Sequence, residues 1–153
     1  MANNENDIEK IKWELRKGSF SYLGSGSSRR VYDMLNGYVL KVAKNKGGIE
    51  QNQVEYRIFQ EEQSELFAPI LFKSDDHRLL VMQKAERIWR MQYILEYYKV
   101  NSMQELVRQP YLLSICKKYD LAKGDLIRKS SWGTIQEVPL LIDYGYTVRS
   151  GRI

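Results

Sequence analysis

The chain has 153 residues, which is enough for one domain or for two small lobes around a cleft and excludes a larger multidomain protein. Hydrophobic residues make up 43% of the sequence and proline occurs only 3 times, so the chain can build a core and global disorder is not expected. The formal net charge of +5 favours an anionic partner, such as a nucleotide, an acidic protein or a nucleic acid, without choosing among them.

One cysteine and one histidine restrict the chemistry of the side chains. Cys116 has no partner for an internal disulfide, and its apolar neighbours predict a buried thiol in a reducing compartment. His77 lies in a polar turn, and no His/Cys metal cage or Ser-His-Asp triad can be built without it. The N-terminus lacks a basic region followed by an apolar stretch, and no run of eighteen apolar residues occurs. We therefore expect a cytoplasmic protein without a membrane span.

The first part of the chain predicts a short helix followed by an antiparallel sheet. The helix runs from Asp7, a candidate N-cap, to Gly18, a natural stop. Residues 19–44 carry β-branched and aromatic runs around a glycine-rich turn and an Asn-Gly turn, which is typical of a three-stranded meander. A surface helix over residues 49–65 and a second hairpin over residues 69–82 follow.

The remaining residues predict a mainly helical region. In chain order its elements are a helix over 89–98, a helical stretch over 102–119 with a capping box from Ser102 to Glu105 and Pro110 at the start of a new helix, a polar loop around Gly124 and Asp125, a break at Trp132 and Gly133, and a strand over 138–142. We expect an α+β fold with a lead-in helix over residues 1–18, a strand-rich lobe over 19–85 with five antiparallel strands and one helix, and a reduced helical lobe over 86–153.

The turn between the first two predicted strands is the first candidate site. Gly24 and Gly26 let the backbone approach phosphate oxygens, although a Gly-Ser hairpin turn is common without that role. Lys41 lies in the third strand, on the face beneath this turn, and Glu55 lies in the following helix. The two side chains predict either an ion pair at a binding site or an ordinary surface ion pair.

The order of these parts resembles the protein-kinase-like fold from Leu23 to Gly145. That family has a G-x-G-x-x-G-x-V loop over the phosphates, a lysine in a V-A-I-K strand, a helix glutamate and a D-F-G aspartate that binds Mg²⁺. The corresponding residues here are Gly24-Ser-Gly26-Ser-Ser-Arg29-Arg30-Val31, Tyr38-Val39-Leu40-Lys41, Glu55 and Asp143-Tyr144-Gly145. Arg29 replaces the third glycine, and Arg29 or Arg30 could itself face phosphate.

The resemblance assigns roles to individual residues. It implies ATP and Mg²⁺ as ligands, with nucleotide contacts from Gly24, Ser25, Gly26, Ser27, Lys41, Glu55, Met82 at the gatekeeper position and Lys84 in the hinge. The catalytic loop, H-G-D-x-x-x-x-N in the aminoglycoside-phosphotransferase branch, reads Lys123-Gly124-Asp125 through Ser130 here. Asp125 and Lys41 become the catalytic residues, and Asp143 with Ser130 becomes the metal site. The alternatives are a loop-capping carboxylate for Asp125 and a strand-ending turn for residues 143–145.

The same resemblance limits the expected activity. Only eight residues follow Gly145, so we expect a truncated kinase-like domain without an activation segment or a peptide-binding helical platform. Lys123 and Ser130 depart from the catalytic-loop pattern. We therefore expect an ATP- and Mg²⁺-binding domain with weak or absent phosphotransfer that acts by binding another protein. An active small phosphotransferase or autokinase is the first alternative. The short, reduced form of the resemblance also suggests that the protein comes from a phage.

Two surface patterns bear on the partner. Trp89, Tyr93, Tyr97 and Tyr98 recur at helical spacing, which predicts core packing and leaves a partner interface as the alternative. Basic side chains flank the predicted cleft and read as a solvated face; they are Lys117, Lys118, Lys123, Arg128, Lys129, Arg149 and Arg152. No nucleic-acid-binding motif accompanies them, so nucleic acid is the least favoured partner.

Overall fold

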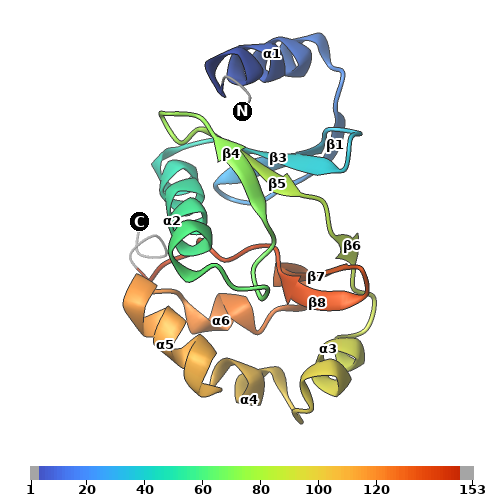
Figure 1. Cartoon of the computed structure of the whole chain (residues 1–153), viewed down its shortest axis with the longest axis vertical. Coiled ribbons are helices and arrows are strands. Elements are labelled where there is room, and N and C mark those ends of the chain that lie inside the picture. Colours follow the sequence, from blue (N-terminus) through green and yellow to red (C-terminus); the bar gives the residue numbers. More distant parts are fainter. Residues whose placement is uncertain (1–3, 149–153) are drawn as a thin grey trace.

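The computed structural model describes residues 4–148 and has two parts with a small sheet between them (Figure 1). The first part comprises α1 (Asn4–Lys17), β1 (Ser21–Ser25), β2 (Arg29–Asp33), β3 (Tyr38–Ala43), α2 (Lys46–Glu62), β4 (Ile70–Lys73) and β5 (Leu79–Gln83). The second comprises β6 (Glu86–Arg87), α3 (Met91–Tyr98), α4 (Met103–Val107), α5 (Pro110–Tyr119), α6 (Lys123–Leu126), the 3-10 helix η1 (Lys129–Ser131), β7 (Trp132–Ile135) and β8 (Val138–Leu141).

The first part is a five-stranded antiparallel sheet in the order β1-β2-β3-β5-β4. The predicted meander and second hairpin are therefore confirmed, and the α+β class with them. In the register, Lys41 of β3 lies opposite Val31 of β2 and Leu80 of β5. The sheet thus places Lys41 in a central strand, with neighbours on both sides.

Helices α1 and α2 cover opposite faces of this sheet. Ile8 and Ile11 of α1 pack with Leu40 and its neighbours, whereas Ile58 of α2 belongs to the larger core on the other face. The N-cap prediction for Asp7 is wrong, because the helix already includes Asn4 and Asp7 lies in its first turn, where a carboxylate favours the helix dipole. Gly18 ends α1 with a φ of 80°, as predicted.

Helix α2 begins and ends three residues earlier than its predicted range of 49–65. Asn45 caps its start by accepting a hydrogen bond from the Gly48 amide, so the helix includes residues that the sequence pattern assigned to a link. Gln63 ends it in the left-handed region with a φ of 49°. The earlier start places Gln51, Asn52 and Glu55 on the buried side of the helix.

Helices α3, α4 and α5 lie at the opposite end of the molecule from α1 (Figure 1). Ser102 caps α4 as predicted, since its hydroxyl accepts a hydrogen bond from the Glu105 amide at 3.0 Å. The predicted stretch over 102–119 is divided at residues 108–109. Pro110 begins α5, and the residue before it, Gln109, adopts an extended ψ of 143°, as the proline ring favours.

The region between α5 and the C-terminal strand differs from the prediction. Residues around Gly124 form the short helix α6 rather than a loop, and the predicted break at Trp132 and Gly133 is strand β7 of a three-stranded sheet β6-β7-β8. A glycine is needed at position 133 because β7 packs closely against Ala85, and not because the chain turns there. An added Cβ would lie 2.8 Å from the Cβ of Ala85. The strand predicted over 138–142 is confirmed as β8.

The larger hydrophobic core joins the two parts. Its wholly buried side chains include Phe67, Trp132 and Tyr144, and Cys116 is buried as predicted. None of the helices between residues 4 and 148 has the length and apolar character needed to cross a membrane.

Candidate functional site

A cleft of about 770 Å³ separates the five-stranded sheet from the second part of the molecule. Residues singled out from the sequence line it from both sides; they are Gly26, Ser27, Lys41, Met82, Lys84, Asp125, Ser130 and Asp143. Gly24 and Ser25 lie in β1 and are not among the lining residues. Glu55 lies in α2 behind the cleft and is wholly buried. Residues far apart in the sequence are therefore brought to one cavity.

Lys41 and Glu55 form a buried ion pair. The Lys41 ammonium lies 2.9 Å from Glu55 Oε1 and donates a second hydrogen bond, of 2.5 Å, to the Ile142 carbonyl. The side chains are 6% and 0% exposed, so the alternative of a surface ion pair is wrong. Since Ile142 precedes Asp143, the same ammonium also links the sheet to the segment that carries the predicted metal ligand.

Arg29, expected only as one of two arginines that could face phosphate, contacts both Glu55 and Asp143. Its guanidinium donates to both oxygens of Glu55, at 2.8 and 2.9 Å, and to Asp143 Oδ1 at 2.7 Å. A further bond of 3.0 Å goes to Asn52. The signal for this placement is strand periodicity: Val31 lies opposite Lys41, and Arg29 is two residues before Val31 and so on the same face.

The charges around Glu55 determine its protonation. Although burial alone raises the pKa of a carboxyl group, the positive charges of Arg29 and Lys41 lower the pKa of Glu55 to about 2. The Tyr144 amide donates a hydrogen bond to Glu55 Oε2 at 2.9 Å. Burial lowers the pKa of Lys41, an effect that Glu55 opposes. Glu55 is thus a fixed anion that holds two cations at the back of the cleft.

Asp143 is positioned by the two residues that follow it. The Tyr144 ring is wholly buried against Phe67, and its hydroxyl donates to the Ala68 carbonyl at 2.9 Å. Gly145 permits close packing on α2, because an added Cβ would lie 2.3 Å from the Gln51 carbonyl oxygen. These anchors leave the Asp143 side chain 46% exposed at the cleft. The segment is therefore more than an ordinary turn at the end of a strand.

Asp125 lies in α6, and side chains of the next segment hold this helix. Ser131 donates to the Asp125 carbonyl at 2.7 Å, and the buried Trp132 indole donates to the Leu126 carbonyl at 2.8 Å. Burial and the charge of Asp143 raise the pKa of Asp125 to about 6, an effect opposed by Arg128, which lies 3.6 Å away. The Asp125 carboxyl group thus titrates near pH 6.

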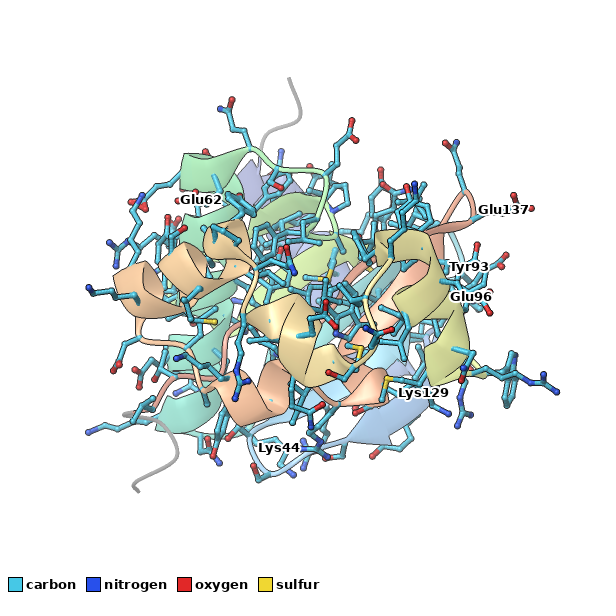
Figure 2. All side chains as sticks on the ribbon, turned by 90° about the horizontal axis from the view of Figure 1, so that it is seen from below. Lys44, Glu62, Tyr93, Glu96, Lys129 and Glu137 are labelled. Atoms are coloured by element: carbon cyan, nitrogen blue, oxygen red, sulfur yellow. The ribbon has the colours of Figure 1, made fainter. Side chains whose placement is uncertain are left out.

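Hydrogen bonds and an ion pair fix the predicted hinge and the predicted glycine turn to neighbouring segments. Met82 is buried and lines the cleft. The Lys84 amide donates to the Gly37 carbonyl at 2.9 Å, and its ammonium lies 2.7 Å from Asp33. The Gly26 amide donates to the Arg29 carbonyl, and Lys44 donates to the Gly26 carbonyl at 2.7 Å. Figure 2 shows Lys44 beside this β1–β2 turn.

The described residues contain no cluster of three or more His, Cys, Asp or Glu side chains that could enclose a metal ion by themselves. Asp143 and Ser130 both line the cleft, and the amides of Ile142 and Asp143 donate to the Ser131 carbonyl. Mg²⁺ in phosphate-binding sites takes one or two carboxylates and completes its shell with phosphate oxygens and water. One half-exposed carboxylate facing the cleft, with Asp125 nearby, fits that requirement.

The aromatic pattern at α3 is exposed rather than buried. Trp89, Tyr93 and Tyr97 are 73%, 41% and 48% exposed, so the prediction of core packing is wrong for these three. Tyr98 alone packs inward, against Trp132 with 5.9 Å between ring centroids. Within α3 only Ile94 is fully buried, so the helix turns a narrow face to the core and leaves these aromatic side chains uncovered. Figure 2 shows Tyr93 at the edge of the molecule beside Glu96 and Glu137.

Several of the basic side chains have local partners. Lys118 pairs with Glu62 at 2.9 Å, Arg128 lies beside Asp125, and Lys129 donates to the Trp89 carbonyl at 3.0 Å. Arg149 and Arg152 lie outside the described residues. A partly paired set of this kind fits the interpretation as a solvated face.

Comparison with known proteins finds similarity among solved structures. No family model matches the chain, and a comparison with curated proteins finds no match. One similar solved structure is the streptomycin–ATP–APH(2″)-IIa ternary complex, with 24% identity, a TM-score of 0.41 and coverage of 60% of this chain and 32% of that one. Another is the aminoglycoside phosphotransferase APH(2″)-Ib with bound ADP, with 25% identity, a TM-score of 0.40 and the same coverage. The chain thus spans about a third of the length of these two proteins.

Proposed function

We propose that the chain is a protein-kinase-like domain that binds ATP with Mg²⁺ in the cleft. The observation that carries this proposal is the buried Lys41–Glu55 pair, which Arg29 joins to Asp143 across a cleft of about 770 Å³. An ordinary surface ion pair would not bring four charged side chains from separate segments together in this way. Two cations fixed behind a half-exposed carboxylate are suited to a polyphosphate that carries a divalent metal.

The predicted ligand residues that line the cleft, and Glu55 behind it, have a place in this proposal. Lys41 and Arg29 would face the phosphates, Met82 would contact the adenine, and the β1–β2 turn would cover the nucleotide through Ser27. Asp143 and Ser130 would hold Mg²⁺, which when bound neutralises phosphate charge. Glu55 would act through Lys41, since it is buried behind it. Lys84 would shape the hinge by its bonds to Gly37 and Asp33.

We further propose that phosphotransfer is weak and that binding of another protein is the main activity, in a cytoplasmic setting. Lys123 and Ser130 replace a histidine and an asparagine of the family pattern, and a neutral hydroxyl is a weaker metal ligand than an amide oxygen. The exposed Trp89, Tyr93 and Tyr97 support a protein partner, because large exposed aromatics are enriched at interfaces. Arg87, whose guanidinium lies 4.5 Å from the Trp89 ring centre, favours an acidic segment of that partner.

The alternative of an active phosphotransferase or autokinase has one observation in its favour. Asp125 lines the cleft near Asp143, and its pKa of about 6 suits a base that accepts the proton of an incoming hydroxyl at neutral pH. The bonds from Ser131 and Trp132 hold its helix without the histidine of the family pattern.

Calorimetric titration with ATP in the presence of Mg²⁺ tests nucleotide binding. Wild type should bind, whereas Lys41→Met and Asp143→Asn should bind at least about tenfold more weakly. Lys46→Met, an exposed lysine at the start of α2, is the matched control and should bind like wild type. No heat at millimolar ATP with folded wild type would reject the proposal.

A radiolabelled-ATP assay separates the two activities. The proposal expects little or no transferred label. Label that wild type transfers and that both Lys41→Met and Asp125→Asn lose would establish the active phosphotransferase instead. Label that survives both substitutions would point to a contaminating enzyme and would leave the proposal of weak phosphotransfer in place.

A further inference from the structure

We propose that Arg29 holds Asp143 in the ligand-free protein and releases it only when a polyphosphate takes the guanidinium, so that the divalent metal and the nucleotide bind cooperatively. This inference rests on the proposed function, which supplies the two ligands, and goes beyond it by assigning an internal competitor for the metal. The competitor is the guanidinium itself.

The two carboxylates that Arg29 contacts differ in how firmly they hold it. Glu55 binds the guanidinium through both oxygens and is 0% exposed, so this contact is the more firmly held of the two. Asp143 binds it through one oxygen at 2.7 Å and is 46% exposed. Breaking the contact to Asp143 therefore leaves Arg29 in place on Glu55 and Asn52.

The charges of the cluster explain why the two ligands would bind together. Arg29, Lys41, Glu55 and Asp143 carry two positive and two negative charges, and each carboxylate already contacts a cation. A divalent metal alone must compete with the guanidinium for Asp143, beside two fixed positive charges. A nucleotide alone brings phosphate toward Asp143 and Asp125. When both ligands bind, the metal would take the place of Arg29 on Asp143, and the phosphates would accept the hydrogen bond that Arg29 no longer donates to Asp143. Both Asp143 and Arg29 then keep a partner.

Arg30 supplies a matched control for this role. It is the next residue of β2, carries the same charge and is exposed, whereas Arg29 is 6% exposed. The strand alternation thus places one arginine in the cluster and the other in solvent. A change in metal binding that follows from loss of net charge alone would be the same for substitution at either position.

The experiment is a titration of the full chain with Mn²⁺, followed by electron paramagnetic resonance of the free ion, with and without a non-hydrolysable ATP analogue. In wild type the analogue should tighten Mn²⁺ binding by about 5- to 150-fold. In Arg29→Gln, Mn²⁺ alone should bind more tightly than in wild type, and the tightening by the analogue should shrink. Arg30→Gln should behave like wild type. Equal Mn²⁺ affinity without nucleotide in wild type and folded Arg29→Gln would overturn the proposal.

A second measurement on wild type does not depend on the stability of the variant. Side-chain ¹⁵N NMR of Arg29 should show no change with Mg²⁺ alone at a concentration that saturates the ternary complex, and a shifted guanidinium signal when the ATP analogue is added. A shift with Mg²⁺ alone would overturn the proposal. If the analogue fails to bind wild type at all, the proposed function fails, while the Mn²⁺ affinities without nucleotide still decide whether Arg29 competes for Asp143.

Discussion

The two walls of the cleft hold charge in different ways. In the wall from the sheet and α2, Glu55 is wholly buried and contacts Arg29, Lys41 and the Tyr144 amide. In the wall from the second part, Asp143 is half-exposed, and Asp125 contacts Arg128, whose side chain is 68% exposed. One wall is thus a fixed electrostatic frame, and the other presents carboxylates that a ligand can still reach. This division suits a site that binds a charged ligand without rearranging its own core.

Removing the central charge of the frame should have the largest effect. Glu55→Gln leaves Arg29 and Lys41 buried without their shared anion, so we expect the free energy of unfolding to fall by about 3–5 kcal/mol in urea titrations at pH 7. Glu65→Gln changes an exposed glutamate and should stay within about 0.5 kcal/mol of wild type. Equal urea midpoints for the two variants would show that the contacts of Glu55 with Arg29 and Lys41 contribute nothing to the free energy of unfolding.

The frame also predicts the response of wild type to acid. The pKa of Glu55 in the folded protein, about 2, is below its ordinary value of 4.5, so its contribution to stability is present above pH 4.5 and is lost as the pH falls toward 2. Glu55→Gln should lack this part of the acid response.

Asp125 in the other wall should show the opposite dependence. Its pKa of about 6 is above the ordinary value of 3.8, so the folded protein binds a proton more tightly than the unfolded chain. The free energy of unfolding should therefore fall as the pH rises from about 4 to about 6, by up to about 3 kcal/mol. Asp125→Asn should remove this fall, and urea titrations across that range measure it. Parallel pH profiles for variant and wild type would contradict the assignment.

The join between the two walls depends on close packing at Gly145. An added Cβ would lie 2.3 Å from the Gln51 carbonyl oxygen, which is part of the α2 backbone and cannot move alone. Gly145→Ala should therefore cost about 1–3 kcal/mol of stability and displace Asp143. Gly124→Ala is the matched control, because its Cβ would meet no atom within 4 Å. If both alanine variants melt at the same temperature, the close packing of Gly145 on α2 does not contribute to stability.

The sheet and the pair of Lys41 with Glu55 were predictable because local patterns specify them. Alternating β-branched residues and two turns determine the meander, and the spacing from strand to helix places the glutamate. Burial of that pair was not predictable, since it depends on how α2 and residues 142–145 pack together. The exposure of Trp89 and Tyr97 escaped prediction for a similar reason: helical spacing identifies a stripe and does not say whether another element covers it. Strand β7 was missed because Gly133 is typical of a break unless its partner strand is known.

The smallest effect should come from the ion pair of Asp125 with Arg128, whose side chain is largely exposed. The two groups are 3.6 Å apart and the Arg128 side chain is 68% exposed, so water and salt weaken their attraction. Arg128→Ala should therefore change the free energy of unfolding by no more than about 0.5 kcal/mol, while it raises the pKa of Asp125 in a ¹³C NMR titration, because the arginine charge lowers that pKa in wild type. A loss of stability as large as that of Glu55→Gln would mean that both walls are fixed frames. An arginine beside a carboxylate gives a short, buried contact in one wall and a longer, more exposed contact in the other, so burial rather than charge sets the difference. The second wall therefore keeps a carboxylate for a ligand.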